Sequence, residues 1–336
     1  MKAWGLLLSL MVVCAGCSTL PVERPVDRYG GPAMRDIENF DRASVDVIRG
    51  FFAPGRQPDG NTVVFASADG LIVFDTGRHA EHVRKIVDIA ETRNQPVVAI
   101  INSHWHLDHI SGNIPLRQRW PSAVVYANDT ALGVALNGFL RQGLESNRRM
   151  VADPATPPAL AADLRGDIAT VEQGDALRAN VSIERNRMPE IDGRKLSLYV
   201  TAAASEGDIW LYDEATQILA AGDLITLPAP FLDTACPQAW RKALDNLLHT
   251  GFKRLVPGHG REMTRADVEL YRTAFNALLD CASGDAPVAA CADAWVATAA
   301  PLLDEASGGE AAARTYAAYY VENVLRPRKF RADCPA

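Results

Sequence analysis

The first half of the chain carries short apolar runs that are rich in β-branched residues. Asn61 to Ser67 and Leu71 to Phe74 are separated only by Ala-Asp-Gly, a spacing that predicts an antiparallel hairpin. Pro96 to Ile101 is apolar without alternation, which is typical of a strand buried on both faces. Between them, Ala80 to Glu91 repeats apolar residues at helical spacing. The pattern therefore predicts strands alternating with helices, as in an α/β fold.

The second half continues this alternation and ends in helices. Asp129 to Met150 has a helical pattern, which ends before a proline-rich segment. Thr264 to Asp267 forms a capping box, which predicts the start of a helix that runs to about Cys281. The further predicted strands are Ala123 to Tyr126, Val181 to Ile183, Leu196 to Val200, Ile209 to Tyr212, Ile218 to Ala220 and Arg254 to Val256. The further predicted helices are Pro237 to His249, Ala290 to Leu303 and Ala311 to Leu325.

The N-terminus resembles an export signal. Lys2 precedes the apolar run Leu6 to Val13, which is too short to span a bilayer. The following Cys14-Ala15-Gly16-Cys17 resembles a bacterial lipoprotein cleavage site, so we expect residues 1–17 to be the signal segment, with Cys17 the lipidated first residue of the mature protein. We therefore expect a periplasmic protein, anchored to the outer membrane by its lipid. The alternative is a plain secretory signal and a soluble exported protein.

Composition limits the class of protein further. A chain of 336 residues with 48% hydrophobic content can bury a large core. Its net charge of -7 and lack of a dense basic stripe argue against nucleic acid as a partner. No protein partner follows from the sequence. Residues 18–50 contain several prolines and glycines, which predict a tether leading to a first strand or helix near Ser44 to Phe52.

Four cysteines remain after Cys17, an even number that predicts two disulfides in an exported protein. Three pairings are possible. We favour Cys281 with Cys291, across the turn between two C-terminal helices, and Cys236 with Cys334, which would tie the tail to the core.

Chemistry is concentrated directly after the buried strand that ends at Ile101. Three of the seven histidines and an aspartate fall within six residues there: His104, His106, Asp108 and His109. Imidazole nitrogen and carboxylate oxygen are ligands that zinc accepts. In an extended chain His104 and His106 point to the same side and can share one metal, while Asp108 and His109 can face a second. The alternative is a pair of surface histidines with a helix-capping aspartate. His79 and His82 have no ligand spacing to this cluster and are expected to be ordinary surface residues.

This His-x-His-x-Asp-His cluster resembles the first metal motif of the metallo-β-lactamase superfamily. Gly70 to Gly77 is similar to that family's strand and Asp-Thr-Gly turn, which supports the metal loop. Leu219 to Leu224 resembles the strand with the bridging aspartate, and Val256 to Gly260 the segment with the last histidine. The resemblance covers Asn61 to Ala282. It implies a four-layer αβ/βα sandwich over residues 51–282, followed by a C-terminal helical extension over 283–336.

The resemblance also implies a set of ligands. His104 and His106 belong to a first metal position, and Asp108, His109 and His259 to a second, with Asp223 between them. The family's first position takes a further histidine, but Ala204 stands at its place, before Ser205-Glu206-Gly207-Asp208. Alanine cannot bind a metal. We therefore expect one tightly bound Zn²⁺ at the second position and a weak or absent neighbour.

The resulting interpretation is a metal-dependent hydrolase that uses metal-bound hydroxide on a small ester, lactone, amide or lactam, with Asp108 as the catalytic residue. A non-catalytic metal-binding or scaffold protein of the same fold is the first alternative. An iron oxidoreductase is the second, which His106 and Ala204 disfavour. Residues 129–170 form either a substrate-shaping lid or a helical pair that only packs on the sheet.

Overall fold

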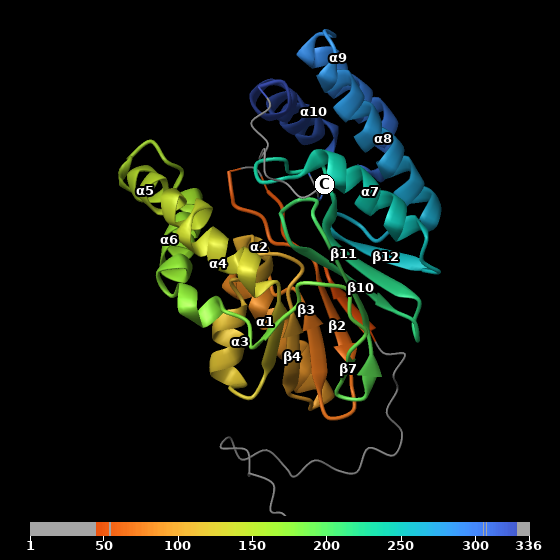
Figure 1. The fold of residues 1–336 in the computed structure, drawn as a ribbon. Helices are drawn as coiled ribbons and strands as arrows, with labels where there is room; N and C mark the ends of the chain where they lie inside the picture. The colour runs from red at the N-terminus through yellow and green to blue at the C-terminus, as the bar shows by residue number, and fades with distance from the viewer. Residues whose placement is uncertain (1–44, 54, 305, 307, 328–336) are drawn as a thin grey trace, which may run out of the picture. The chain divides into compact units, whose positions relative to one another are not determined.

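Two β-sheets lie face to face in the computed structural model, which describes residues 45–53, 55–304, 306 and 308–327 (Figure 1). The first sheet has strands in chain order, which are β1 (Val45–Ile48), β2 (Thr62–Ala66), β3 (Leu71–Phe74), β4 (Val97–Ile101), β5 (Val124–Ala127) and β6 (Val181–Ser182). The second sheet has the order β12 (Arg254–His259), β11 (Ile218–Thr226), β10 (Asp208–Asp213) and β9 (Ser197–Thr201). Both sheets are mixed, and β7 (Glu190–Ile191) and β8 (Arg194–Lys195) form a separate short pair.

The predicted hairpin is confirmed, because β2 and β3 pair antiparallel with Phe65 opposite Ile72. Alternate residues of these strands face different layers. Phe65 and Ile72 enter the core between the two sheets, whereas Val64 and Val73 face the outer helices. Both faces of the sheet are therefore apolar, which explains why the strands have continuous apolar runs.

Helices cover the outer face of each sheet. On the first sheet these are α1 (Ala80–Arg93) and α3 (Asn113–Arg119), which bury Ile86 and Leu116 in one cluster with β2–β5. The second sheet is covered by α7 (Pro237–Leu248), α8 (Arg265–Ser283), α9 (Val288–Ala299) and α10 (Gly309–Tyr320). Short turns of 3-10 and π helix complete the C-terminal part at Ala300–Leu302 and Val321–Leu325. The expected four-layer αβ/βα sandwich with C-terminal helices is confirmed.

The helical segment after β5 differs from its prediction. It forms α4 (Asp129–Asn137), α5 (Phe139–Ala152) and α6 (Pro158–Glu172), with a 3-10 turn at Gly174–Leu177 (Figure 1). The single helix predicted for Asp129 to Met150 is broken at Gly138, whose φ of -111° and ψ of -103° are not helical. Gly138 adopts this conformation at little cost because it has no Cβ.

The second sheet also extends beyond its prediction. The strand expected at Ile218 to Ala220 continues as β11 to Thr226, so Asp223 lies within a strand. Gly222, with a φ of +53°, accommodates a register shift against β12 and lets pairing resume beyond it. Glycine tolerates this left-handed conformation, which is why a strand passes through a position that looks like a break.

Some of the C-terminal predictions are confirmed, and others concern residues that the structure does not describe. The capping box at Thr264 and the Cys281–Cys291 disulfide are confirmed. Cys236 is also disulfide-bonded, whereas its favoured partner Cys334 lies outside the described residues, as do Cys17 and the signal segment. Among the described residues, no helix is both long and apolar enough to cross a membrane.

The expectation that His79 and His82 are ordinary surface residues is wrong. His82 is buried on α1, and its Nε2 lies 2.7 Å from Thr62 Oγ1. Burial lowers the pKa of His82 to about 4. His79 pairs with Asp59, with 2.8 Å between Nδ1 and Oδ2. Helical spacing does not reveal this, because histidine is common both at surfaces and in polar positions of cores.

We predict that His82 makes the fold less stable in acid. The pKa of His82 is 6.5 in its ordinary state and about 4 in the folded protein. At pH values between these two, His82 binds a proton in the unfolded chain but not in the folded chain. Stability therefore falls as the pH drops through this window, by at most about 3 kcal/mol. Urea unfolding at a series of pH values should show a shallower acid decline for His82→Gln than for the native chain. His249→Gln, at an exposed histidine, is the control; equal slopes for all three proteins would contradict the prediction.

Candidate metal centre

The candidate ligands lie at the ends of strands from both sheets. His104 and His106 lie in the segment between β4 and α2 (Leu107–Ile110), where the backbone bends at residues 103–105, so the expected extended chain is not found. Asp108 and His109 lie in α2 and belong to a different group. Asp223 and His259 reach the same place from neighbouring strands of the second sheet. The structure thus brings together all six residues, although β4 and β12 are far apart in the sequence.

These six residues form two groups. His104, His106 and Asp223 make one, and Asp108, His109 and His259 make the other; within each, one ligand atom per residue lies within 4.8 Å of the others. In the second group, His259 Nε2 is 3.0 Å from Asp108 Oδ2.

Asp223 lies between the groups. Its Oδ2 is 3.7 Å from His104 Nε2, and its Oδ1 is 3.2 Å from His109 Nε2. One carboxylate therefore faces both groups, with a different oxygen toward each.

The burial of this centre leaves polar atoms without partners. His104 Nε2 and both carboxylate oxygens of Asp223 are buried and make no hydrogen bond of good geometry within the described residues. Buried polar atoms without partners are costly and rare. Nitrogen and oxygen donors that converge in this way fit a divalent cation such as zinc.

Charges around His109 point to the same conclusion. Burial alone would lower the pKa of His109, but the charges of Asp223 and Asp75 outweigh it and raise that pKa well above its ordinary value. Burial would raise the pKa of Asp108, but His109 and His259 hold it well below its usual range. Without a metal, a proton on His109 offsets this carboxylate charge. The centre therefore requires positive charge, and a metal cation would replace that proton.

Asp75, in the turn after β3, fixes the metal loop. Its carboxylate accepts hydrogen bonds from Ser103 N at 2.7 Å, from Ser103 Oγ at 2.7 Å and from His109 Nδ1 at 2.8 Å. Since Nδ1 of His109 donates to Asp75, Nε2 is left for the ligand group.

Two glycines allow the backbone to pass close to the ligands. A Cβ on Gly258 would lie 2.0 Å from Asp223 Oδ1, and one on Gly60 would lie 2.4 Å from the ring of His109. Any larger residue at either position would displace a ligand, so both positions require glycine.

Ala204 lies in the turn before β10, where the family resemblance led us to expect a histidine. The residue is fully buried, and its neighbours Ala203 and Ser205 donate backbone hydrogen bonds of 2.9 Å to Asp208 Oδ2. Burial is the main cause that raises the pKa of Asp208 to about 7. The turn is therefore held by Asp208, and the methyl side chain of Ala204 offers no atom that could bind a metal.

Thr234 contacts the first group and was not identified from the sequence. Its hydroxyl donates to the carbonyl oxygen of Ala204 at 2.8 Å and lies 2.8 Å from His106 Nε2. Because its one hydrogen goes to Ala204, the hydroxyl must accept from Nε2–H of His106. Nδ1 is then the nitrogen of His106 with a free lone pair. Thr234 lies between β11 and α7 in no recognisable motif, so only the fold reveals this contact.

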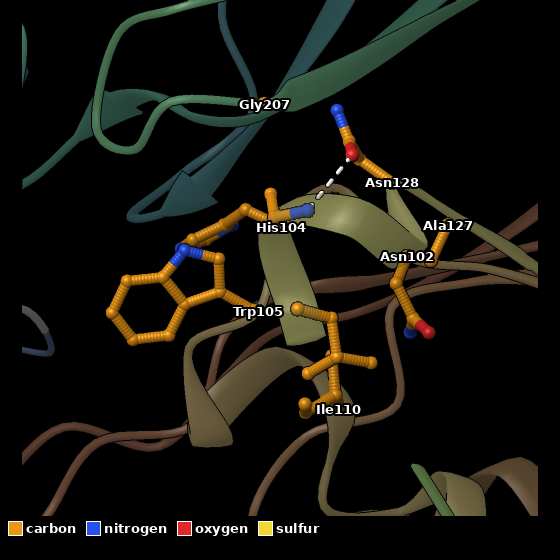
Figure 2. Close-up of a pocket in the computed structure, with 9 residues that line it drawn as sticks. Asn102, His104, Trp105, Ile110, Ala127, Asn128 and Gly207 are labelled. Carbon is orange, nitrogen blue, oxygen red and sulfur yellow. Dashed lines mark hydrogen bonds between the residues drawn. The ribbon is translucent and has the colours of Figure 1, made fainter. Parts of the chain in front are cut away.

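A small cavity lies beside the first group (Figure 2). It adjoins only His104 among the six candidate ligands, and the rest of its lining is mainly apolar. The lining residues are Asn102, His104, Trp105, Ile110, Ala127, Asn128, Ala131, Leu132 and Gly207. The cavity does not reach the second group, so we do not assign the reaction to it.

Comparison with known proteins supports the assignment of the fold. Residues 55–259 match the family model described as "Metallo-beta-lactamase superfamily". The search of curated proteins found no match.

Similar solved structures include metallo-β-lactamases and an alkylsulfatase. A metallo-β-lactamase from Pontibacter korlensis is 17% identical, with a TM-score of 0.50, over 69% of this chain and 99% of that one. DIM-1 metallo-β-lactamase exposed to ceftazidime is 13% identical, with a TM-score of 0.51, over 73% of this chain and 97% of that one. The stereoselective inverting sec-alkylsulfatase Pisa1 from Pseudomonas sp. is 19% identical, with a TM-score of 0.54, over 83% of this chain and 50% of that one. At these identities the likeness concerns the fold.

The contact of Thr234 predicts the tautomer of His106. Burial lowers the pKa of His106, so its ring is neutral at pH 7, and we expect the hydrogen on Nε2. Nitrogen-15 NMR of the metal-free protein should show this tautomer in the native chain and in Thr234→Ser, which keeps the hydroxyl. Thr234→Val should give a mixture of tautomers. A native His106 with its hydrogen on Nδ1 would contradict the prediction.

Proposed function

The chain belongs to the metallo-β-lactamase superfamily, and on this premise we propose that it is a metal-dependent hydrolase of a small ester, lactone, amide or lactam. One observation carries the proposal: within the described residues, the buried carboxylate of Asp223 faces His104 with one oxygen and His109 with the other, and neither oxygen accepts a hydrogen bond of good geometry. The contacts of Asp223 with His104 and His109, at 3.7 and 3.2 Å, are longer than those of a compact ion pair, and they leave both oxygens available to a cation.

We propose that Asp108, His109 and His259, with Asp223, hold the tightly bound ion, and that zinc is this ion. When bound, zinc supplies Lewis acidity and lowers the pKa of water toward about 7. His104, His106 and Asp223 form an incomplete position, because Ala204 provides no nitrogen. This position is weakly occupied or empty in our proposal.

The protein's own groups have separate tasks. Asp75 keeps Nε2 of His109 turned to the centre by accepting a hydrogen bond from Nδ1. Asp108 presents Oδ2 toward His259, where it would also orient the attacking water and accept its hydrogen bond. His106, the only one of the six that is partly exposed, marks the side from which water and substrate enter.

We also propose that the protein works outside the cytoplasm, anchored through a lipid on Cys17. The Cys281–Cys291 disulfide supports an oxidising compartment. In this proposal residues 18–50 are the tether and the lead-in to the domain, which includes strand β1 at Val45–Ile48. Residues 51–282 are the catalytic domain and 283–336 an extension. The extension contacts a loop at the centre, since Tyr320 donates a 2.8 Å hydrogen bond to Asp233, next to Thr234.

Replacement of Asp108 tests the hydrolase proposal. Asp108→Ala removes one ligand and the group that orients water, so we expect turnover to fall by at least about a hundredfold with the fold intact. Chromogenic lactam, lactone and ester substrates provide the assay, and circular dichroism verifies the fold. Asp245→Ala, which breaks an exposed ion pair with Arg272, should leave turnover unchanged. Undiminished turnover by folded Asp108→Ala would exclude this mechanism, and a native protein that binds metal but turns over no substrate would favour a binding role.

Restoring the absent histidine tests the metal count. Ala204→His should raise the tightly bound metal from about one to about two per chain, because a third nitrogen completes the first position. Elemental analysis after mild chelation provides the measurement, and Ala204→Leu controls for added bulk. If the native chain already retains two ions, another residue completes the first position and this part of the proposal is wrong.

A further inference from the structure

Arg78 lies in the turn after β3 and is buried against the second ligand group. Its side chain is 11% exposed, and its Nη2 is 3.6 Å from Asp108 Oδ1. Two other contacts hold the residue in place. Its Nε donates to Pro58 O at 3.0 Å, and its backbone N donates to Asp59 Oδ1 at 2.6 Å. The residue is therefore held beside Asp108 by Pro58 and Asp59, which lie between β1 and β2.

The two oxygens of Asp108 face different partners. Oδ2 is 3.0 Å from His259 Nε2 and 3.7 Å from His109 Nε2, whereas Oδ1 faces Arg78. A positive charge on one side of a buried carboxylate selects the rotamer in which the other oxygen points to the histidines. In Asp108, one oxygen therefore faces Arg78 and the other faces the histidines of the second group.

Arg78 is itself held by a residue from outside the metal motifs. Its Nη1 forms a buried ion pair with Asp167, whose side chain is 6% exposed. Asp167 lies on α6, in the helical segment that follows β5. The arginine therefore lies between two carboxylates, with Asp108 on the metal side and Asp167 on the helix side.

Charge pairing also decides where α6 docks. Asp163 lies one turn before Asp167, on the same face, and pairs with Arg56 at distances of 2.6 and 2.8 Å. Of the four residues that α6 buries, two are these aspartates and the others are Ala161 and Leu164. Two apolar contacts supply little of the specificity of docking, and buried carboxylates are tolerated only with their partners in place.

We propose that Arg78 is a positioning residue for the metal ligand Asp108, and that Asp167 of α6 holds Arg78 in position. This rests on the proposed function, since it assumes a metal at the Asp108 group. The helix α6 is then part of the support of the metal centre and not only a cover for substrate. Without Asp167, the guanidinium is drawn toward Asp108 and competes with the metal for its oxygens. Without Arg78, Asp108 loses its orientation and Asp167 is left buried and unpaired.

We call the contacts from Asp167 through Arg78 to Asp108 the relay. Titration of the full chain with Co²⁺ alone tests it without any substrate. Arg78→Gln and Asp167→Asn should each weaken the first Co²⁺ by about ten- to hundredfold, as is typical when a group that orients a ligand is lost. The double variant should bind Co²⁺ no more weakly than Arg78→Gln alone, because both substitutions act through the contact of Arg78 with Asp108. Arg78→Lys, which keeps the charge, should recover part of the affinity. The visible absorption of bound Co²⁺ should shift in Arg78→Gln, which a change in stability alone would not cause.

Asp163→Asn is the matched control. It breaks the anchor of α6 to Arg56 and removes the charge 3.1 Å from His79 Nε2, but leaves the contacts of Arg78 with Asp108 and Asp167 in place. Co²⁺ affinity should therefore stay within about twofold of the native value while thermal stability falls. An equal loss of affinity in Asp163→Asn and Asp167→Asn would overturn the relay in favour of general docking of α6. Native affinity and spectrum in folded Arg78→Gln would overturn it too. If Arg78→Gln does not fold, native affinity in folded Asp167→Asn would overturn it. If the native chain binds no Co²⁺ at all, the proposed metal centre fails and the relay fails with it.

Discussion

The structure depends on burying the carboxylates of Asp75, Asp108 and Asp223 around one histidine, His109. Isolated buried charges cost several kcal/mol each, so a fold that gathers three carboxylates must supply compensating positive charge. At Asp75, hydrogen bonds offset part of the cost of burying the charge, because its carboxylate accepts from three donors. Asp223 has none of good geometry within the described residues. The cation that we propose at the centre would account for this difference between two equally buried carboxylates.

The two sheets make this arrangement possible because strands of both end at the same place. One sheet supplies the turn after β3 and the loop after β4, and the other supplies β11 and β12. The apolar layer between the sheets fixes their separation and therefore the distance between His109 and Asp223. Outer contacts then set the orientation of single ligands: Asp75 acts on His109, Thr234 on His106 and, in our proposal, Arg78 on Asp108.

The sequence predicts those features that depend on neighbouring residues. The histidine cluster, the β2–β3 hairpin and the capping box of α8 are local, so their patterns are visible in the chain. Asp223 and His259 are distant from the cluster, and only the family resemblance connected them to it. Thr234, and the pairing of Arg78 with Asp167, could not be predicted, because each depends on segments that meet only in the folded protein. The same reason explains the error at His82, whose burial is decided by contact with Thr62.

In our proposal, the carboxylate charge gathered around His109 binds one dominant cation. Anomalous diffraction at the zinc edge, from crystals of the full chain grown with zinc, measures this directly. We expect one strong peak among Asp108, His109, His259 and Asp223, with a weak peak or none at His104 and His106. The absence of a peak at the Asp108 group, or a stronger one at the His104 group, would contradict it.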